Sequence, residues 1–382
     1  MTTPPGKPVP PLPPTAPPSV VALPISLRLQ GAIRLLPERS GDPTVLGQRF
    51  IESARLLGID LGLMFGTLDS GGYVRQVCLA VPGAGGTAML FLSSDTSKPK
   101  AWPAGTLRGL VGSGGGDTGL VDRVALIAHA CEVISRPGPT IKRACTLVQA
   151  LLEPREKDVA AALAKSEFIS LGELAYLRRP LSGPKADPEA GFVPEWTGGI
   201  QIRSMAELLR EGRSPNDVDA LLGEALERSY EDTLDCPELC GMRNLENVIE
   251  SHRSVGEYDP SLWWLVFNAA GPQGCLLLSV VPEQDSVELV YIGLSPAVRG
   301  KGLASNLMGS GIAALYRGSV TGTAAGVQAR PAGVGVQVRG TGGLTCAVDM
   351  RNQPALRLYQ RLGFVRTSLR LPWVKSLRTR EL

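Results

Sequence analysis

The sequence predicts an α/β protein of two tandem domains, each a mixed sheet flanked by helices, behind a proline-rich N-terminal tail. The chain has 382 residues, of which 43% are hydrophobic, enough to bury two ordinary cores. In the second half, helical patterns come before and after a run of strand patterns. The order strand, helix, aromatic residue, strand occurs near the end of each half, which indicates an internal repeat.

The N-terminal tail is predicted to span residues 1–24, ten of which are proline. Proline fixes φ and removes amide donors, so this segment favours an extended polyproline II coil outside the fold. It could be a ligand for a proline-binding module, but a disordered extension is the simpler interpretation. The first domain is then expected over 25–181, a linker over 182–195, and the second domain over 196–382.

The two copies of the repeat place similar elements in the same order. The first copy has a strand, a helix and an aromatic residue at 145–152, 155–165 and Phe168. The second copy has them at 344–349, 353–361 and Phe364. Each copy follows a glycine-containing turn and an amphipathic helix, predicted at 121–134 and 304–316. The repeat therefore predicts a diverged tandem duplication.

Further elements of the second half follow from local signals. Ser214-Pro215 is typical of a helix start, and apolar residues from Val218 to Leu226 then keep helical spacing. A second helix is expected over 245–252. The predicted strands are 262–268, 274–281 and 287–294, and the adjacent Trp263 and Trp264 should lie on opposite faces of the first of them.

Composition excludes several classes of function. Lys and Arg total 39 against 36 Asp and Glu, and this net charge of +3 argues against nucleic-acid or membrane-surface partners. With two His and only a lone Cys236-x3-Cys240 pair, a metal site is not expected. Seven Cys without a regular framework indicate free thiols in a reducing compartment. Because no membrane span or signal peptide is evident, we expect a cytoplasmic protein.

The stretch 287–304 carries the clearest chemical signal. A strand ends at Ser295-Pro296, and a turn containing Gly300 and Gly302 leads into a helix. Glycines let the backbone approach a ligand closely, and a helix N-terminus attracts anions. This turn should hold a pyrophosphate, although a plain strand-to-helix connection has the same local pattern.

This stretch resembles the acetyl-CoA-binding motif of the GCN5-related N-acetyltransferases (GNAT). That motif consists of Arg or Gln, any two residues, Gly, any one residue, and then Gly or Ala. Here the motif is Arg299-Gly-Lys-Gly-Leu-Ala304. A second family motif matches Val348–Asn352 together with Leu358-Tyr359 and Leu362–Phe364. The resemblance is specific over 287–370 and implies the acyl-CoA N-acyltransferase fold, with a mostly antiparallel sheet.

The resemblance also implies roles for individual residues. Main-chain groups of the strand end would bind the pantetheine arm and the thioester carbonyl, at Ile292, Gly293 and Leu294. The turn and the first helical residues would cradle the pyrophosphate, at Arg299, Gly300, Lys301, Gly302, Leu303, Ala304 and Ser305. The start of the next helix would contact the pantetheine arm near the sulfur, at Asn352 and Ala355. Tyr359 occupies the place where many members have the general acid that protonates the leaving thiolate.

Acyl transfer to an amine also needs a base, because only the neutral amine is a nucleophile. Glu288, on the strand that carries the glycine turn, is the candidate; an exposed strand carboxylate without catalytic role is an equal alternative. Tyr359 lies on a helix with an apolar face, so without the resemblance it would be interpreted as a core aromatic residue.

The first half lacks the corresponding groups. Leu163 replaces Tyr359, and Glu156 replaces Asn352, when positions are counted back from Phe168 and Phe364. Its glycine-rich segment Gly112–Asp117 has no matching Arg, and Asp117 would repel a phosphate. The first domain is therefore expected to be a degenerate, non-catalytic copy that shapes the acceptor cleft.

Together these features predict an N-acetyltransferase that transfers acetyl from acetyl-CoA to a primary amine of a small molecule by direct attack in a ternary complex. The alternatives are a catalytically inactive acyl-CoA-binding sensor or scaffold, and a protein or peptide N-acetyltransferase. Acetyl-CoA would be the co-substrate, with no metal, nucleic acid or membrane involved. The acceptor, the role of the glycine-rich segment 318–343 and the oligomeric state are left open by the sequence.

Overall fold

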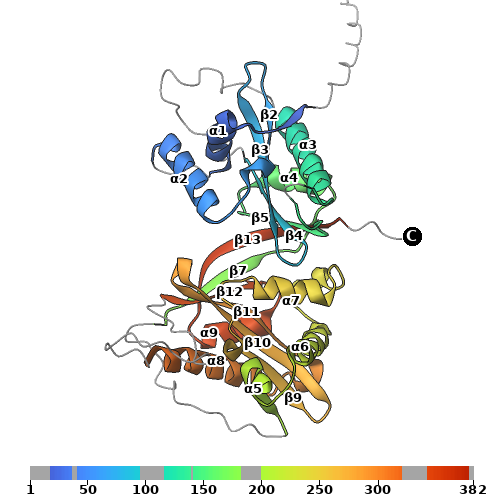
Figure 1. The fold of residues 1–382 in the computed structure, drawn as a ribbon, viewed down its shortest axis with the longest axis vertical. Helices are drawn as coiled ribbons and strands as arrows, with labels where there is room; N and C mark the ends of the chain where they lie inside the picture. The colour runs from blue at the N-terminus through green and yellow to red at the C-terminus, as the bar shows by residue number, and fades with distance from the viewer. Residues whose placement is uncertain are drawn as a thin grey trace, which may run out of the picture. The chain divides into compact units, whose positions relative to one another are not determined.

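The computed structural model describes residues 18–36, 41–94, 116–138, 141–181, 199–320 and 342–377 (Figure 1). The chain divides into two units. The N-terminal unit comprises Met1–Ala80, Phe91–Val133 and Lys157–Ser166. The C-terminal unit comprises Val81–Leu90, Ile134–Glu156 and Glu167–Leu382.

Helices and strands alternate along the chain as expected for an α/β protein. The helices are α1 Ile25–Leu35, α2 Pro43–Leu56, α3 Gly116–Ile134, α4 Lys157–Lys165, α5 Met205–Arg210, α6 Pro215–Tyr230, α7 Leu245–Arg253, α8 Leu303–Val320 and α9 Gln353–Arg361. The strands are β1 Val20–Ala22, β2 Met64–Leu68, β3 Val74–Gly83, β4 Thr87–Leu92, β5 Leu147–Leu152, β6 Ile169–Ser170, β7 Leu174–Arg179, β8 Gln201–Ser204, β9 Trp263–Asn268, β10 Gly271–Val281, β11 Ser286–Leu294, β12 Gly343–Asp349 and β13 Val365–Ser376.

The N-terminal boundary of the fold differs from the prediction. Residues 1–17 of the predicted tail lie outside the described residues, but Val20–Ala22 form β1, which pairs with β2 in antiparallel register. Leu23 is buried. The apolar run Val20–Leu23 thus joins the sheet, because its burial outweighs the influence of the neighbouring prolines. The predicted linker 182–195 lies outside the described residues.

The predicted helix start at Ser214 is a capping box. The Ser214 hydroxyl accepts a hydrogen bond from the Asp217 amide at 3.2 Å. The Asp217 carboxylate accepts one from the Ser214 amide at 3.2 Å. These two bonds satisfy amides that a helix end otherwise leaves unpaired, so α6 begins at Pro215 as the sequence indicates.

The sheet of the C-terminal unit is mixed and mostly antiparallel, which confirms the predicted fold class. Its strand order is β5-β13-β7-β12-β11-β10-β9-β8. Within this order only β11 and β12 are parallel neighbours. Trp263 is fully buried on β9 and Trp264 is half-buried, in agreement with their predicted placement on opposite faces.

Helices cover both faces of this sheet. On one face Gly311 of α8 packs against Leu276 and Leu278 of β10. Tyr291, which pairs with Leu277 in the neighbouring strand, shares a hydrogen bond of 2.8 Å with Ser229 of α6. Because side chains alternate along a strand, α6 lies on the face opposite α8. The core of the unit thus lies on both faces of the sheet, beneath α8 on one face and beneath α6 on the other.

The internal repeat is visible in the strand and helix positions. β5 begins at 147 and β12 at 343, and α4 begins at 157 and α9 at 353. Both pairs are 196 residues apart, as 343 follows 147 and 353 follows 157. Each of these two strands also belongs to a parallel pair: β5 pairs with β4, and β12 pairs with β11. The tandem arrangement is therefore confirmed.

The two copies exchange their last strands. β7, from the first copy, pairs with β12 of the second, so that Arg179 lies opposite Leu344. The end of β13, from the second copy, pairs with β5 of the first, so that Lys375 lies opposite Val148. These two pairings are equivalent under the 196-residue offset. The sequence repeat predicted a final strand in each copy, but the exchange of these strands was not predicted.

Gly274 allows β10 to approach β11 closely. Its φ is +154°, and a Cβ atom there would lie 2.2 Å from the carbonyl oxygen of Gly293. Such a separation is impossible for an L side chain without moving the backbone. The end of β11, where cofactor contacts are predicted, can therefore lie this close to β10 only with glycine at position 274.

We expect Gly274→Ala to lower the free energy of unfolding of the C-terminal unit by more than about 1 kcal/mol, because the native backbone cannot accept the new methyl group. Thermal unfolding followed by circular dichroism measures the change. Gly309→Ala is the control, since Gly309 lies within α8 with open space around it and should gain about 0.5–1 kcal/mol. Equal melting temperatures for Gly274→Ala and the wild type would contradict this assignment.

Candidate active site

The candidate site is a gap between two parallel strands. β11 and β12 pair only from Ser286 to Glu288 on one strand and from Gly343 to Thr345 on the other. Beyond this point β11 stays paired with β10 up to Leu294, and β12 stays paired with β7 up to Asp349. The facing edges of β11 and β12 therefore diverge, and their main-chain groups have no strand partner among the described residues. A ligand with amide groups could complete these edges.

A bulge in β11 lies at the start of the gap. Leu289 pairs with Leu278 and Tyr291 pairs with Leu277, so Val290 is the extra residue. A bulge bends its strand and changes the face to which the following side chains point. Glu288 and Tyr291 consequently lie on the same face, although their spacing along a regular strand would place them on opposite faces.

The glycine turn follows directly after β11. Gly300 and Gly302 have φ of +75° and +76°, and nothing lies within 4 Å of a Cβ atom at either position. The first amides of α8, which begins at Leu303, have no acceptor within the helix. The amide of Ser305 already donates to the Gly302 carbonyl at 3.1 Å. An open turn of left-handed glycines at a helix N-terminus fits the predicted anion site.

The side chain of Arg299 donates hydrogen bonds to main-chain carbonyls. Its guanidinium donates to the carbonyl of Leu294 at 2.8 Å. It also donates to three carbonyls at the C-terminal end of α6, those of Ser229, Glu231 and Asp232. The arginine thus caps α6 and supports the glycine turn from behind, so any contribution to the predicted cradle comes from its main chain. Lys301 likewise donates to the Ala297 carbonyl at 3.0 Å.

Asn352 and Ala355 form the N-terminal cap of α9. The Asn352 side chain accepts a hydrogen bond from the Ala355 amide at 3.2 Å. The Asn352 amide donates to the Asp349 carbonyl at 2.9 Å. The capping interaction places the start of α9 directly after the free end of β12. Contact of these residues with a pantetheine arm stays a prediction.

Glu288 lies at the last paired position before the gap. It is half-buried, and the Thr345 hydroxyl lies 3.5 Å from its carboxylate. Burial raises the pKa of Glu288 above its ordinary value of 4.5, which outweighs the opposite effect of Thr345. A carboxylate of raised pKa at the mouth of the gap can accept a proton, so the geometry is compatible with a base as well as with a buried strand residue.

Tyr359 is part of the core and lies beside the same gap. It is 5% exposed, and its ring packs against Phe364 with centroids 5.4 Å apart. Burial, and then the charges of Cys346 and Asp235, raise the pKa of Tyr359 well above 10. The phenol therefore keeps its proton at neutral pH, as a general acid must. Core packing and proton donation are compatible here.

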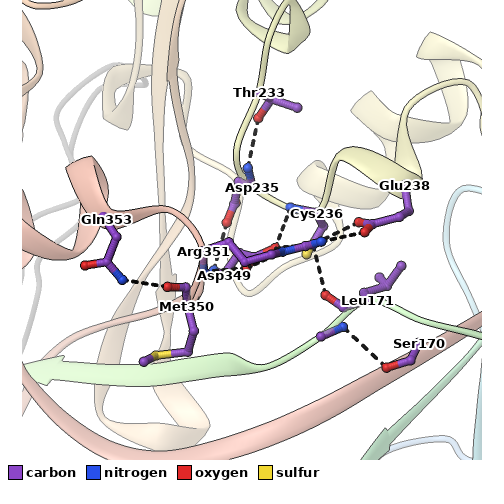
Figure 2. A network of polar contacts seen from close by, with 11 residues as sticks. Ser170, Leu171, Thr233, Asp235, Cys236, Glu238, Asp349, Met350, Arg351 and Gln353 are labelled. Carbon is purple, nitrogen blue, oxygen red and sulfur yellow. Dashed lines mark hydrogen bonds and ion pairs between the residues drawn. The ribbon is translucent and has the colours of Figure 1, made fainter.

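A polar network that the sequence did not reveal lies at the end of β12 (Figure 2). Asp349 and Arg351 join the loop that contains Asp235, Cys236 and Glu238. The polar groups of the loop 232–239 and their partners on β12 and after it are more than a hundred residues apart in sequence. Local patterns cannot reveal such pairs.

The first copy carries different residues at the equivalent places. Met89 pairs with Gln149 where Glu288 pairs with Thr345, and the fully buried Leu163 stands in place of Tyr359. The first copy thus lacks both proton-transfer candidates. The segment 112–115 of its predicted glycine-rich loop lies outside the described residues.

Buried charges also join the elements that would flank a cofactor in the first copy. Arg123 of α3 is 1% exposed; it forms an ion pair of 2.7 Å with Asp158 and donates to the Ser93 carbonyl at 2.8 Å. The Ser94 hydroxyl donates to Asp158 at 2.8 Å. Ser93 and Ser94 follow β4, and Asp158 begins α4. The strand end and the helix start are therefore tied together in this copy.

The chain is similar to a curated protein and to several solved structures. No family model matches the chain. The chain is 29% identical over 229 residues to a mycothiol acetyltransferase of Rhodococcus erythropolis, and the match covers 58% of this chain. It spans 63% of the length of that relative.

Solved structures with a similar arrangement include a GCN5-related N-acetyltransferase from Sphaerobacter thermophilus. It is 17% identical with a TM-score of 0.49, covering 93% of this chain and 91% of its own. A tandem GNAT protein from the clavulanic acid biosynthesis pathway is 14% identical with a TM-score of 0.46, covering 95% of this chain and 99% of its own.

The fold, the gap between β11 and β12 and the glycine turn fit the resemblance to the GNAT superfamily, and the sequence match to an acetyltransferase confirms that resemblance. The tandem arrangement, with the motifs in its second copy, resembles mycothiol synthase, and the sequence match to a mycothiol acetyltransferase agrees with this resemblance.

None of the helices in the described part of the chain has the length and hydrophobicity of a membrane span. No group of three or more His, Cys, Asp or Glu side chains in the same part of the chain could hold a metal ion.

We expect Glu288→Gln to stabilise the protein at about pH 8 and to have little effect at about pH 4.5. The folded state raises the pKa of Glu288, so it binds the proton more tightly than the unfolded state does. The wild type must therefore lose stability as the pH rises from 4.5 through the folded pKa, whereas the neutral amide does not.

Melting temperatures measured at several pH values test this difference, with Glu283→Gln as the control because Glu283 is exposed. If the stability difference between Glu288→Gln and the wild type does not change with pH, folding does not raise the pKa of Glu288.

Proposed function

We propose that this protein is an N-acetyltransferase that transfers acetyl from acetyl-CoA to a primary amine of a small molecule. The single observation that carries the proposal is the parting of β11 from β12 after Glu288, followed by the Gly300–Gly302 turn at the start of α8. The similarity to a protein named as an acetyltransferase supports it. The protein is also proposed to be cytoplasmic.

The residues present fit an acyl-CoA. In an antiparallel pair, alternate residues point their N–H and C=O groups away from the partner strand. The end of β11, at Ile292–Leu294, is paired with β10 on one side and borders the gap on the other. It can therefore hydrogen-bond an extended pantetheine arm. The turn from Gly300 to Ser305 would bind the pyrophosphate through main-chain amides.

Acetyl-CoA supplies an acetyl group activated as a thioester. The nitrogen of the neutral amine attacks the carbonyl carbon, so a C–N bond forms, and the C–S bond then breaks. Glu288, directly or through a water molecule, takes the proton that the ammonium loses. Amides at the strand edge stabilise the oxyanion, and Tyr359 gives its proton to the leaving thiolate. The nitrogen of the new amide loses a second proton, which returns the Tyr359 phenolate to the neutral phenol.

Two other functions are distinguishable from this one. A catalytically inactive sensor would bind acetyl-CoA through the same turn but would acetylate nothing. A protein or peptide N-acetyltransferase would use the same chemistry on a longer acceptor. A small-molecule acceptor is favoured because the similar protein is named for one.

We expect Glu288→Gln and Tyr359→Phe each to lower kcat by about 10²–10⁴-fold with acetyl-CoA affinity within about twofold of the wild type, because each removes one proton transfer. CoA release with a panel of primary amines, together with calorimetric titration of acetyl-CoA, measures both quantities. Glu283→Gln and Tyr73→Phe are the controls outside the site. If the wild type binds acetyl-CoA and acetylates no amine, the protein is a sensor and not an enzyme.

We expect one acetyl-CoA to bind per chain, because Met89, Leu163 and the Arg123–Asp158 ion pair replace the site in the first copy. Isothermal titration calorimetry measures the stoichiometry. Gly302→Val should abolish this binding, since φ at Gly302 is +76° and valine is strongly disfavoured there. Two sites per chain, or one site that survives Gly302→Val, would place binding in the first copy.

A further inference from the structure

The carboxylate of Asp349, at the end of β12, is fully buried and fully satisfied. It accepts hydrogen bonds from the amides of Cys236 at 3.1 Å and Arg351 at 2.8 Å. The Arg351 guanidinium adds bonds to both oxygens, at 3.0 Å from Nε and 2.6 Å from Nη2. These bonds lower the pKa of Asp349 despite its burial. Its negative charge is thus neutralised within the protein.

Arg351 extends this interaction to two other segments (Figure 2). It binds both oxygens of Glu238, at 2.6 and 2.9 Å, and it donates to the Leu171 carbonyl at 3.1 Å. One side chain therefore joins the end of β12, the loop 232–239 and the segment that leads into the exchanged strand β7. A planar guanidinium suits this task because its donors have fixed directions.

The loop held in this way bends sharply on either side of Asp235. Asp232 and Cys236 have φ of +50° and +47°, a conformation that costs free energy in residues other than glycine. The Asp235 carboxylate accepts a hydrogen bond of 2.9 Å from the Asp349 amide. The amide of Asp235 donates to the Thr233 hydroxyl at 3.1 Å. The loop thus places this carboxylate at the free end of β12.

Asp235 differs from its neighbour Asp349 in forming no ion pair among the residues that the structure describes, although the nearby charge of Arg351 acts to lower its pKa. Within the described residues, the Asp349 amide is the only group that donates a hydrogen bond to its carboxylate. Burial raises the pKa of Asp235, although its side chain keeps solvent-exposed surface. The Asp349 amide that donates to Asp235 lies at the end of β12, beyond the part of β12 that pairs with β11. Besides burial, the charge of Asp235 raises the pKa values of Tyr359, Tyr291 and Cys346. These residues belong to β11, β12 and α9, which border the gap.

We propose that Asp235 binds the ammonium group of the acceptor amine, and that Asp349 and Arg351 position Asp235 for this role. The inference rests on the proposed function, since it places the acceptor at the gap where acetyl transfer would occur. A compact ammonium has three donors and a positive charge, which matches a carboxylate with a vacant oxygen that forms no ion pair in the described part of the chain. Glu288, on the other strand of the gap, then receives the proton. The acceptor class is a cationic primary amine.

The test compares Asp235→Asn with the wild type, using primary amines from ethanolamine to an amino sugar and the alcohol of the same skeleton for each. For the best amine, Asp235→Asn should raise the acceptor KM at least tenfold while the acetyl-CoA KM stays within twofold. Asp235→Glu should restore part of the affinity. Arg351→Met should shift the acceptor KM in the same direction, and Arg351→Lys should do so less, since its ammonium keeps the positive charge and can form one ion pair.

Arg143→Met is the matched control. Arg143 forms an ion pair with Glu250 in the same unit, away from Asp235, so its loss should leave both KM values unchanged. Melting temperatures show whether each variant is folded. An unchanged acceptor KM in folded Asp235→Asn would overturn the proposal.

The inference is separable from the proposed function. If no amine is acetylated, the same amines are titrated into the CoA-bound protein. Binding of amines but not alcohols, weakened at least tenfold in Asp235→Asn, supports the proposal even without turnover. Binding that is equal in the variant, or absent from the wild type, overturns it.

Discussion

The exchange of β7 and the end of β13 between the two copies is the constraint on which the rest of the structure depends. β12 diverges from β11 after Thr345, so β7 is its only strand partner along Cys346–Asp349 within the described residues. Main-chain hydrogen bonds to β7 keep this strand extended while its other edge is free. The gap between β11 and β12 thus exists because a strand from the first copy supports one of its walls.

Duplication of one backbone has produced two chemically different copies. The parallel ladders β4–β5 and β11–β12 have equivalent register, yet Met89 and Leu163 occupy the places of Glu288 and Tyr359. In the first copy, the buried Arg123 forms an ion pair with the partly buried Asp158 near the end of β4. A buried pair of this kind needs its own hydrogen bonds and leaves little room for a ligand. The first copy contributes strands, and the second retains the polar groups.

Charge is distributed unequally around the gap. The Arg299 guanidinium donates hydrogen bonds to carbonyls at the end of α6. The Arg351 guanidinium donates to the carboxylates of Asp349 and Glu238. Within the described residues, neither guanidinium forms an ion pair with Glu288 or Asp235. Burial thus raises the pKa of one carboxylate on β11, Glu288, and of one hydrogen-bonded to the end of β12, Asp235, and neither forms an ion pair in the part of the chain described. Such an arrangement suits a ligand that brings its own positive charge.

The sequence by itself determined the elements and the turn: the capped start of α6, the repeat, and the left-handed glycines before α8. These depend on neighbouring residues, so local patterns reveal them. It also identified Glu288 and Tyr359 as candidates, through motifs that extend over a few residues. Only the tertiary structure decided that the copies exchange strands, that Arg299 caps α6, and that Asp235 lies beside Asp349. These contacts join residues about 70 to 180 positions apart, and whether they form depends on how the strands pair and pack.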